Sequence, residues 1–578
     1  MQSIIILYDK EDVIEFNNQN EDIKDIFLFS PGLELYLKNK DNYNIFKPNK
    51  VSDLLIQKNI IYKSKKFDQE FKKNFFLLND LDKGIIENIH NIIFITLFSF
   101  LYLIENLKEF EKFKLIYNQK VYKFENFEEF IPLFLKKIFH KKNQGFFNYL
   151  KLKKKSSFYK IIIKLNNLVC RFGKKKNNIL IIGSLLVKKI LQEIDQKNII
   201  FQLKPCHDFK VYHLISNIFS LLNFLKKKKN FYYFPILNDQ KSHQNFKKNL
   251  FNFFNSFEDK NFKYFKNILL DELNNYCQNQ MNSKDDICKL LDFIKPKSVL
   301  VDQLRFGLST ILASSSLSRK IDVILVPHGS ISIPNDEYSE FVLPICARGL
   351  IYSKVANYSV AQSKISFDAI KFYDNDLKIL KSKPLLFGEN FYKKKENIKR
   401  EKIVFLHAST PKSLCKWPWI YESYNEYINN IKDLIKTFRN KKNIELRIRF
   451  REGPECDLET FKKLIDINKN KFVKISKIKD FFEDLENSDC LISFSSTSIE
   501  EALFSNKRIF IYQGNKNYKH INYKFSGNND IIYSNQNDVG EKLDLIINTY
   551  KLEDYNVLWK NDIAKNENLK DFINKNEI

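Results

Sequence analysis

The stretch from Asp484 to Gln513 restricts the fold of this chain more than any other, because it reads as strand, loop, helix, turn and strand. Cys490 to Phe494 is a short apolar run of strand length. Ser495-Ser496-Thr497-Ser498 follows it as a loop made only of hydroxyl residues, and Arg508 to Tyr512 is the next apolar run. This order predicts a βαβ unit of a parallel sheet.

Two overlapping capping boxes are expected to start the helix of this unit. Thr497 is followed three residues later by Glu500, and Ser498 by Glu501. A helix start that follows a parallel strand presents free backbone N–H groups and the positive end of the helix dipole. The small hydroxyls leave room there for a phosphate, and Glu501, one turn into the helix, is placed to reach a ribose hydroxyl beside it. The alternative is an ordinary βαβ unit with a well-capped helix.

The same residues resemble the donor-nucleotide segment of GT-B glycosyltransferases, above all those that build bacterial surface polysaccharides. The family pattern runs roughly S-D-x-x-I-S-x-x-S-S-x-x-x-E-A-x-x-x-G-K-P-x-x-x-Y. It is matched by Ser488, Asp489, Ile492, Ser493, Ser495, Ser496, Glu501, Ala502, Lys507 and Tyr512. Asn506 stands where the family has Gly, and Arg508 where it has Pro; Asn tolerates the left-handed turn expected there. Bacterial sialyltransferases, Kdo transferases and CDP-glycerol polymerases share the segment, so the resemblance implies a class and no particular donor.

The bulk composition allows a large protein with an excess of positive charge. The chain has 578 residues and 44% hydrophobic content, enough for two or more domains with cores. The formal charge of +26 invites a nucleic-acid or membrane partner. Lys, Asn, Ile and Phe are abundant while Gly, Ala and Arg are scarce, which is typical of an AT-rich genome, so we interpret most of the Lys as solvated surface. A basic face against an anionic membrane is one expected contact, at about 1 kcal/mol per well-placed Lys.

Cysteine usage and hydropathy predict a cytoplasmic protein. Eight cysteines are scattered without a C-x-x-C pair, which argues against zinc and against a disulfide scaffold. No signal peptide is expected, because Ile4 to Leu7 is too short an apolar core. The best membrane candidate, Asn91 to Ile104, falls short of the roughly 20 residues that a span needs. We therefore predict that it is a buried helix.

The first 290 residues or so carry patterns without a motif. Ser3 to Tyr8 predicts a strand and Lys114 to Phe124 a hairpin. Residues 140–176 combine Lys-Lys clusters with aromatic residues, which suits an RNA- or membrane-facing patch or, alternatively, solvated Lys on helix faces. Residues 226–283 are rich in Phe and Asn, and we expect them to be helical.

Apolar runs in the middle of the chain predict an open parallel sheet. Its strands are expected at Asn178 to Ile182, Ile199 to Leu203, Ser298 to Val301, Asp322 to Val326 and Gly349 to Tyr352. A helix is expected from Gly307 to Leu317, and another from Ser353 through Ser363.

Polar residues follow two of these strands, where ligands of open α/β sheets bind. Asp302 follows the run at 298–301, and His328 follows the run at 322–326 in the order Pro-His-Gly-Ser. A His at such a strand end is suited to act as a general base, and the alternative is a His that only caps the strand. The segment is similar to the acceptor-domain segment of the same transferases, in which an acidic loop follows P-H-G. Here that loop is Asn335-Asp336-Glu337, and the resemblance implies His328 or, failing it, Asp336, Glu337 or Asp302 as the base for the acceptor hydroxyl.

A second hydroxyl-bearing loop follows the first strand of the carboxyl-terminal lobe. That strand is predicted at Lys402 to Leu406, and Ser409 and Thr410 come shortly after it. We expect both hydroxyls to contact donor phosphates.

The run from Ile444 to Phe450 alternates strictly between apolar residues and arginines. Arg447, Arg449 and Arg451 share one face, and Arg forks suit phosphate or carboxylate. Arg451 is therefore expected to add a donor contact, and a salt-bridged edge strand is the alternative. Related transferases usually end this strand in R-x-H-P, whereas this chain has no His there.

Together the patterns predict an α/β chain of GT-B-like form, in which two Rossmann-like lobes face a cleft. The predicted domains are residues 1–390, an acceptor-side lobe with helical insertions, residues 391–550, a donor-nucleotide lobe, and residues 551–578, a helical tail that packs back on the first lobe. The expected donor-binding residues are Ser495, Ser496, Thr497, Ser498, Glu501, Ser409, Thr410 and Arg451. No metal or other cofactor is expected, because the helix dipole and Arg supply the positive charge.

The predicted function is transfer of a sugar from a nucleotide donor to a surface-polysaccharide or glycolipid acceptor, in the cytoplasm or at the inner face of the plasma membrane. Three alternatives remain open: a CDP-glycerol-type polyol-phosphate transferase, a nucleotide-sugar 2-epimerase of the same two-lobe fold, and a non-enzymatic basic protein that binds nucleic acid or membrane. No recognised nucleic-acid motif supports the last, so nucleic acid is not an expected partner.

Overall fold

The computed structural model describes residues 3–19, 24–47, 54–74, 82–107, 110–117, 120–142, 157–172, 178–182, 199–204, 210–222, 229–234, 244–257, 260–305, 307–334, 336–385, 402–411, 422–453, 455–478, 480–505, 507–515, 531–552 and 568–575. Asn335 and Asn506, which the sequence singled out, lie outside these residues.

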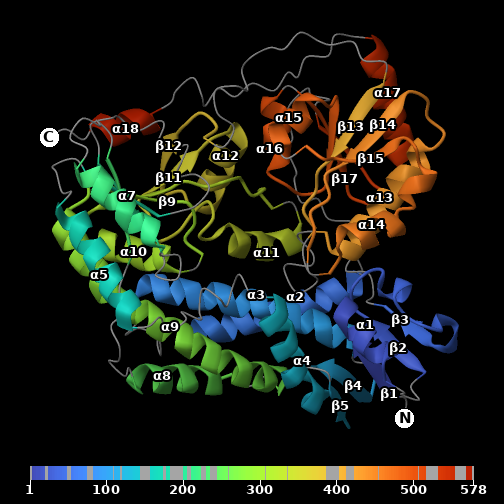
Figure 1. Ribbon diagram of the computed structural model, residues 1–578, viewed down its shortest axis with the longest axis horizontal. Helices are drawn as coiled ribbons and strands as arrows, with labels where there is room; N and C mark the ends of the chain where they lie inside the picture. Colours follow the sequence, from blue (N-terminus) through green and yellow to red (C-terminus); the bar gives the residue numbers. More distant parts are fainter. Residues whose placement is uncertain are drawn as a thin grey trace. The chain divides into compact units, whose positions relative to one another are not determined.

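The chain divides into two compact units, each described by itself. Unit 1 comprises Met1–Lys66, Ile95–Lys142 and Glu389–Lys560, and unit 2 comprises Phe67–Phe94, Asn143–Gly388 and Asn561–Ile578. Unit 1 holds a five-stranded and a six-stranded sheet, and unit 2 holds a seven-stranded sheet (Figure 1). The described residues thus form one sheet more than the sequence predicted, and residues 1–66 group with the carboxyl-terminal sheet.

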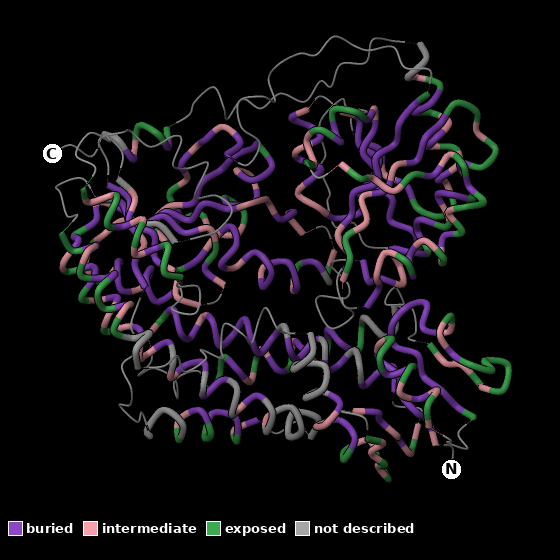
Figure 2. Tube along the Cα trace, viewed as in Figure 1, coloured by how far each residue is buried: buried purple, intermediate pink, exposed green. Residues whose placement is uncertain are grey.

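The six-stranded sheet of unit 1 has the strand order β15-β14-β13-β16-β17-β18, and every neighbouring pair is parallel. Its strands are β13 (Ile403–His407), β14 (Ile444–Ile448), β15 (Val473–Ile475), β16 (Cys490–Ser493), β17 (Arg508–Tyr512) and β18 (Ile531–Ser534). Its helices are α13 (Tyr424–Phe438), α14 (Leu458–Leu464), α15 (Phe481–Glu486), α16 (Ser498–Phe504) and α17 (Val539–Leu552). The order is that of a doubly wound Rossmann sheet, and most residues of its strands are buried, apart from the edge strand β15 (Figure 2).

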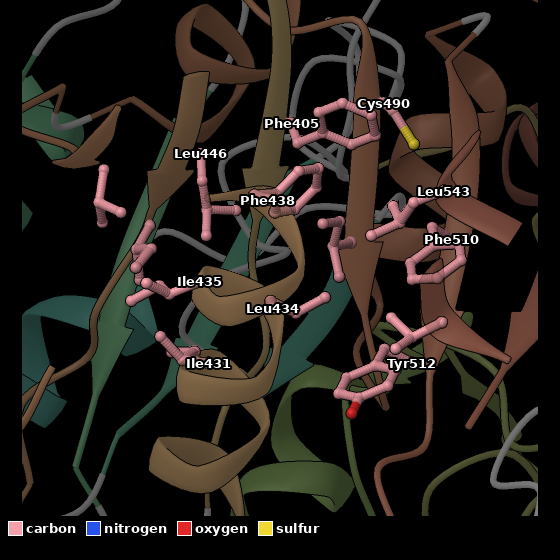
Figure 3. Close-up of a cluster of buried hydrophobic side chains, with 14 of the residues drawn as sticks. Phe405, Ile431, Leu434, Ile435, Phe438, Leu446, Cys490, Phe510, Tyr512 and Leu543 are labelled. Atoms are coloured by element: carbon pink, nitrogen blue, oxygen red, sulfur yellow. The ribbon is translucent and has the colours of Figure 1, made fainter. Parts of the chain in front are cut away.

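One face of this sheet packs on α13 and α17. A capping box of Ser423 and Glu426 starts α13, and its apolar residues then recur at helical spacing, which gives it one buried stripe. The stripe meets the inward-facing residues of four adjacent strands (Figure 3). The core residues labelled there are Phe405, Ile431, Leu434, Ile435, Phe438, Leu446, Cys490, Phe510, Tyr512 and Leu543.

The seven-stranded sheet of unit 2 is also parallel throughout and has the order β12-β11-β10-β9-β6-β7-β8. Its strands are β6 (Asn178–Ile182), β7 (Ile199–Leu203), β8 (Lys229–Tyr233), β9 (Ser298–Val301), β10 (Asp322–Leu325), β11 (Tyr358–Ala361) and β12 (Lys378–Lys381). The helices described between residues 157 and 373 are α5 (Ser157–Phe172), α7 (Val211–Leu222), α8 (Gln244–Asn255), α9 (Lys260–Ile294), α10 (Leu308–Leu317), α11 (Glu337–Ala347) and α12 (Lys364–Tyr373). The predicted α/β class with two Rossmann-like sheets is confirmed by these two strand orders.

Near the carboxyl terminus, α18 (Leu569–Lys575) packs on this same sheet. Leu569 and Ile573 enter the core beside Val360 and Leu380. The backbone of Lys381, at the end of β12, exchanges two hydrogen bonds with Asn568.

Three predicted elements in this region are wrong. Residues 349–352 form a turn instead of a strand, because Gly349 adopts φ +71° and its carbonyl accepts a hydrogen bond from the Leu304 N–H. The strand that does follow is β11, and Ser363 caps the start of α12 instead of lying at a helix end. Residues 226–283, expected to be helical, include β8, whose short aromatic run Phe-Tyr-Tyr forms the edge of the sheet.

The five-stranded sheet of unit 1 has the order β3-β2-β1-β4-β5. Its strands are β1 (Ser3–Leu7), β2 (Asp25–Leu28), β3 (Asn44–Phe46), β4 (Lys112–Tyr117) and β5 (Lys120–Phe124), and the helices of this part of the chain are α1 (Lys10–Asn17), α2 (Leu54–Asn74), α3 (Lys83–Leu107) and α4 (Phe127–Lys142). The antiparallel pair β4–β5 is the predicted hairpin. The sheet docks on the start of α14 through a hydrogen bond between the hydroxyls of Tyr36 and Thr460 and an ion pair of Lys10 with Asp457 at 3.8 Å.

The apolar run from Asn91 to Ile104 lies within α3. Ile92, Ile93, Phe94 and Phe98 are at most 1% exposed, so the prediction of a buried helix is confirmed. None of the helices in the described part of the chain combines the length and the hydropathy needed to cross a bilayer.

Candidate functional site

The strand order of each Rossmann-like sheet identifies one position where a ligand is expected. In the six-stranded sheet, the chain winds one way from β13 to β15 and the other way from β16 to β18, so the order reverses between β13 and β16. In the seven-stranded sheet the reversal falls between β6 and β9. Ligands of open α/β sheets bind in the crevice outside the carboxyl ends of the strands at this reversal.

The loops that follow β13 and β16 are tied together by hydroxyl groups. Ser493 Oγ donates to the Ala408 carbonyl at 3.0 Å, and Ser498 Oγ donates to the same carbonyl at 3.1 Å. Ser409 Oγ accepts a hydrogen bond from the Phe494 N–H at 2.9 Å. The structure therefore brings Ser409 and the loop Ser495 to Ser498 to one place, although about 85 residues separate them in the chain.

These bonds divide the predicted donor hydroxyls into two groups. Ser409, Ser495 and Ser498 are at most 5% exposed, and the bonds of Ser409 and Ser498 fix the shape of the crevice. Ser496, Thr497 and Thr410 are only half-buried. The second group is therefore the more accessible one, although Ser496 Oγ also accepts a hydrogen bond from the Ser498 N–H at 3.2 Å.

The predicted capping boxes at the start of α16 are wrong. The N-cap of α16 is Thr497, with φ −60° and ψ −20°, and its side chain makes no capping hydrogen bond. A capping side chain needs an extended backbone to reach the N–H groups of the first turn, and the hydroxyl of Ser498 is already bonded to Ala408. Helix α16 has seven residues, so binding at this place depends on the loop geometry more than on a helix dipole.

Two of the three arginines on the predicted basic face are held in ion pairs. Arg447 and Arg449 both bind Asp484, at 3.2 and 3.0 Å, and the Asp484 side chain is fully buried. Arg447 also binds Glu445 at 2.7 Å. Burial alone would raise the pKa of Glu445, but hydrogen bonds from Lys474 and Arg447 outweigh it and lower that pKa. The salt-bridge alternative therefore holds for these two arginines, on an interior strand instead of an edge.

Arg451 lies beyond the end of β14 and is exposed. Its carbonyl accepts a hydrogen bond from the Tyr424 hydroxyl at 3.3 Å, which holds its backbone near the start of α13. Since β14 neighbours β13 on the side away from β16, Arg451 follows the strand next to the crevice. Glu501 lies in the first turn of α16 and is half-buried.

His407, the last residue of β13, is a feature of this site that the sequence did not single out. It is 2% exposed, and its Nδ1 makes no hydrogen bond with the described residues. Burial lowers its pKa to about 3. The ring of Tyr427 lies 5.3 Å from its own ring. A buried, neutral imidazole thus lies directly before the loop that carries Ser409 and Thr410.

Replacing His407 by phenylalanine is expected to make the protein less sensitive to acid. Above pH 6.5 the histidine is neutral in both the folded and the unfolded chain. Between pH 6.5 and pH 5 only the unfolded chain takes up the proton, so the wild type loses about 2 kcal/mol that the variant keeps. Urea unfolding at pH 7 and at pH 5 measures this difference, and an equal loss in both proteins would show that His407 is not held neutral.

On unit 2, the predicted acceptor-side residues gather at two adjacent strand ends. Asp302 directly follows β9, which borders the reversal, and His328 lies three residues beyond the end of β10, the next strand. Both side chains are half-buried. The carboxyl ends of parallel strands share one edge, so the structure places both residues at the ligand-binding edge of this sheet.

The predicted acidic loop is instead the start of a helix. Asp336 Oδ1 accepts a hydrogen bond from the Ser339 N–H at 2.8 Å, and Ser339 Oγ accepts one from the Asp336 N–H at 3.0 Å. This reciprocal pair caps α11, whose first residue is the exposed Glu337. The Asp336 carboxylate thus has a structural partner that the sequence did not predict.

Among the described residues, no group of three or more His, Cys, Asp or Glu side chains is arranged to hold a metal ion. Among the predicted donor residues, those that the structure leaves partly or fully exposed to a negatively charged ligand are the hydroxyls of Ser496, Thr497 and Thr410 and the guanidinium of Arg451.

These observations define the chain as a protein with two doubly wound Rossmann-like sheets, each with polar residues at its ligand-binding edge. No family model matches the sequence, and no curated protein matches it. Solved structures give weak likenesses. UDP-GlcNAc 2-epimerase from Neisseria meningitidis bound to UDP-GlcNAc is 12% identical, with a TM-score of 0.39 over 69% of this chain and 98% of that one.

Two further structures show the same level of likeness. UDP-GlcNAc 2-epimerase from Methanocaldococcus jannaschii is 14% identical, with a TM-score of 0.37 over 67% of this chain and 95% of that one. Medicago truncatula UGT71G1 complexed with UDP-glucose is 10% identical, with a TM-score of 0.33 over 60% and 82%. At these TM-scores the likenesses carry no argument about this chain, and the class of its fold rests on the strand orders.

Proposed function

We propose that the chain is a glycosyltransferase that moves a sugar from a nucleotide-activated donor to a surface-polysaccharide or glycolipid acceptor. The observation that carries the proposal is that two hydroxyl-bearing loops are bonded together beyond the ends of β13 and β16, at the reversal of a Rossmann sheet. The motif resemblance of residues 484–513 points to the same place. The facing of two lobes across a cleft, as in GT-B enzymes, is part of this proposal.

In this scheme the donor phosphates lie against the half-buried hydroxyls of Ser496, Thr497 and Thr410. Ser409, Ser495 and Ser498 shape the crevice beneath them, since their side chains are buried. Glu501 holds the ribose, and Arg451, the exposed arginine of its set, balances the phosphate charge. The scheme assigns no role to a metal.

The acceptor hydroxyl loses its proton to a group at the edge of the seven-stranded sheet. His328 is the first candidate because it is half-buried at the end of β10, the second strand from the reversal, and an imidazole is the side chain most often used as a general base. Asp302, at the neighbouring strand end, is the second. Asp336 and Glu337 rank lower, since one caps α11 and the other is exposed.

The test is an assay of purified protein with CMP-, CDP-, UDP- and GDP-linked donors, in the presence and absence of glycan and glycolipid acceptors. Nucleotide release that requires an acceptor supports transfer. Conversion of a UDP-sugar without an acceptor, followed by NMR, would identify an epimerase instead. Transfer from CDP-glycerol but from no sugar donor would identify a polyol-phosphate transferase.

Two serine variants separate ligand contact from loop structure. Ser496→Ala is expected to raise the KM for the donor about tenfold or more, because a hydrogen bond to a charged group is lost. Since Ser496 Oγ also accepts a hydrogen bond from the Ser498 N–H at 3.2 Å, this variant should lose up to about 1 kcal/mol of stability as well. Ser498→Ala, which deletes the bond to the Ala408 carbonyl, is expected to cost about 1 kcal/mol of stability. Melting curves and donor titrations of both variants check this, and a donor KM unaltered in Ser496→Ala would remove that serine from the site.

A further inference from the structure

Helices α5 and α7 of unit 2 turn their apolar residues outward. On α5, Ile161, Leu165, Leu168 and Phe172 recur at helical spacing, and each is between 47% and 69% exposed. On α7, the residues at the corresponding spacing are also 48% to 65% exposed: Val211, Ile215, Phe219 and Leu222. We call these eight residues the apolar face. The two helices pack against each other, so their stripes are neighbours. An exposed apolar surface of this kind marks an interaction site.

The inward side of the same helices carries three buried asparagines that are hydrogen-bonded to one another and to the sheet edge. Asn217 of α7 donates to Asn166 of α5 at 2.8 Å and accepts from the Tyr232 N–H of β8 at 2.9 Å. Asn166 and Asn167 donate to the carbonyls of Tyr232 and Phe234 at 2.9 and 2.7 Å. Asn166 and Asn217 are completely buried and Asn167 is 3% exposed.

The inward asparagines fix the orientation of the two helices, with their apolar residues facing outward. Rotating either helix to bury its leucines and phenylalanines would break these bonds and leave buried amides without partners, at a cost for each. The fold therefore cannot bury the apolar face by rotating these helices. Something outside the described fold covers it, or it stays in contact with water.

The positive charge of residues 141–230 indicates which kind of partner binds the apolar face. Residues 141–230 contain 21 Lys and Arg but only 3 Asp and Glu, so they hold +18 of the formal +26 of the whole chain. Neither α5 nor α7 contains an acidic residue, and Lys164 and Lys210 are exposed on α5 and just before α7. A second copy of this face would bring like charge against like charge. Nucleic acid would gain little from aliphatic side chains, since it binds through phosphates and base stacking.

We propose that the apolar face docks on the surface of an anionic lipid bilayer. The leucines, isoleucines and phenylalanines enter the boundary between headgroups and acyl chains, while lysines such as Lys164 and Lys210 lie against anionic headgroups. Both helices lie flat on the membrane in this arrangement and neither spans it. The inference does not depend on the reaction proposed above, because it rests on the outward residues, the hydrogen-bonded inner side and the charge of this region.

Vesicle co-sedimentation of the full chain tests the proposal. Wild type is expected to sediment with phosphatidylcholine vesicles that contain about 30% phosphatidylglycerol, at least about tenfold more than with phosphatidylcholine alone. Raising the salt from about 0.05 M to about 0.5 M should release it, since the shorter Debye length screens the lysines. Phe172→Ser combined with Phe219→Ser should weaken binding by about tenfold or more.

The matched control is Phe372→Ser, which removes another exposed phenylalanine, 53% exposed on α12, and should bind like wild type. Because all three phenylalanines are exposed, the variants should keep the wild-type melting temperature. No sedimentation with the anionic vesicles, or equal binding by wild type and the double variant, would overturn the proposal. A wild-type dimer that becomes a monomer in the double variant would also overturn it, since a second copy would then cover the face.

Discussion

Replacing His328 by alanine is expected to slow sugar transfer by about 10²- to 10⁴-fold, the range that a positioned general base contributes. His328 lies beyond the end of β10, at the carboxyl edge of the seven-stranded sheet. Donor affinity should stay unchanged, because the proposed donor contacts belong to the six-stranded sheet. Steady-state kinetics should therefore show a loss in kcat with little change in the donor KM.

Asp336→Asn and Glu337→Gln provide the comparison for this prediction. Asp336 caps α11 through Ser339. Because the asparagine oxygen can still accept the Ser339 N–H, the replacement should cost well under about 1 kcal/mol of stability and leave most of the turnover. Glu337 is exposed at the first position of the helix, and its replacement should change neither quantity. If His328→Ala turned over like wild type while either acidic variant lost a hundredfold, the base would be wrongly assigned.

Asp484→Asn is expected to lower the free energy of unfolding by about 3–5 kcal/mol, the usual cost of removing one partner from a buried ion pair. The Asp484 side chain is fully buried and binds Arg447 and Arg449, whose side chains are 18% and 23% exposed. The asparagine would leave two partly buried guanidinium groups near each other without their shared anion. Urea unfolding at neutral pH measures the loss.

Glu459→Gln is the control for the buried pair. Glu459 forms an ion pair with Lys462 at 2.8 Å, but its side chain is 72% exposed. Exposed pairs contribute between nothing and about 1 kcal/mol, so this variant should unfold almost like wild type. Equal and small losses in both variants would mean that the arginines find other partners and that Asp484 does not hold this part of the sheet together.

The sequence predicted the βαβ unit around residues 490–512 because its signals are local. The apolar runs, the hydroxyl loop and the helix-forming residues all lie within about 25 residues, and β16, α16 and β17 appear where they were expected. The strand ends that carry Asp302 and His328 were predicted for the same reason.

The sequence could not predict which hydrogen bond each hydroxyl of this unit makes. Ser498 belongs to a capping pattern by spacing, yet it bonds to Ala408, 90 residues away in the chain. Thr497 adopts a helical backbone that prevents capping. Such choices depend on which loops the sheet brings together, and no local pattern records that.

The strands β2, β3 and β8 were missed for a related reason. β3 has three residues and β2 four, so each is too short to show a period. β8 has five residues, its aromatic run follows a row of lysines, and its strand character comes from pairing with β7. The fold of short strands is decided by their partners, since strand propensity depends strongly on context.

Crystallography with UDP, CDP, CMP and GDP tests the proposed donor-nucleotide site most directly, because it locates the bound nucleotide. We expect nucleotide density beyond the carboxyl ends of β13 and β16, with phosphate oxygens within about 3.2 Å of the hydroxyl or backbone N–H groups of Ser496 or Thr497. A nucleotide bound at the five-stranded sheet, or at the amino ends of the six strands, would contradict it.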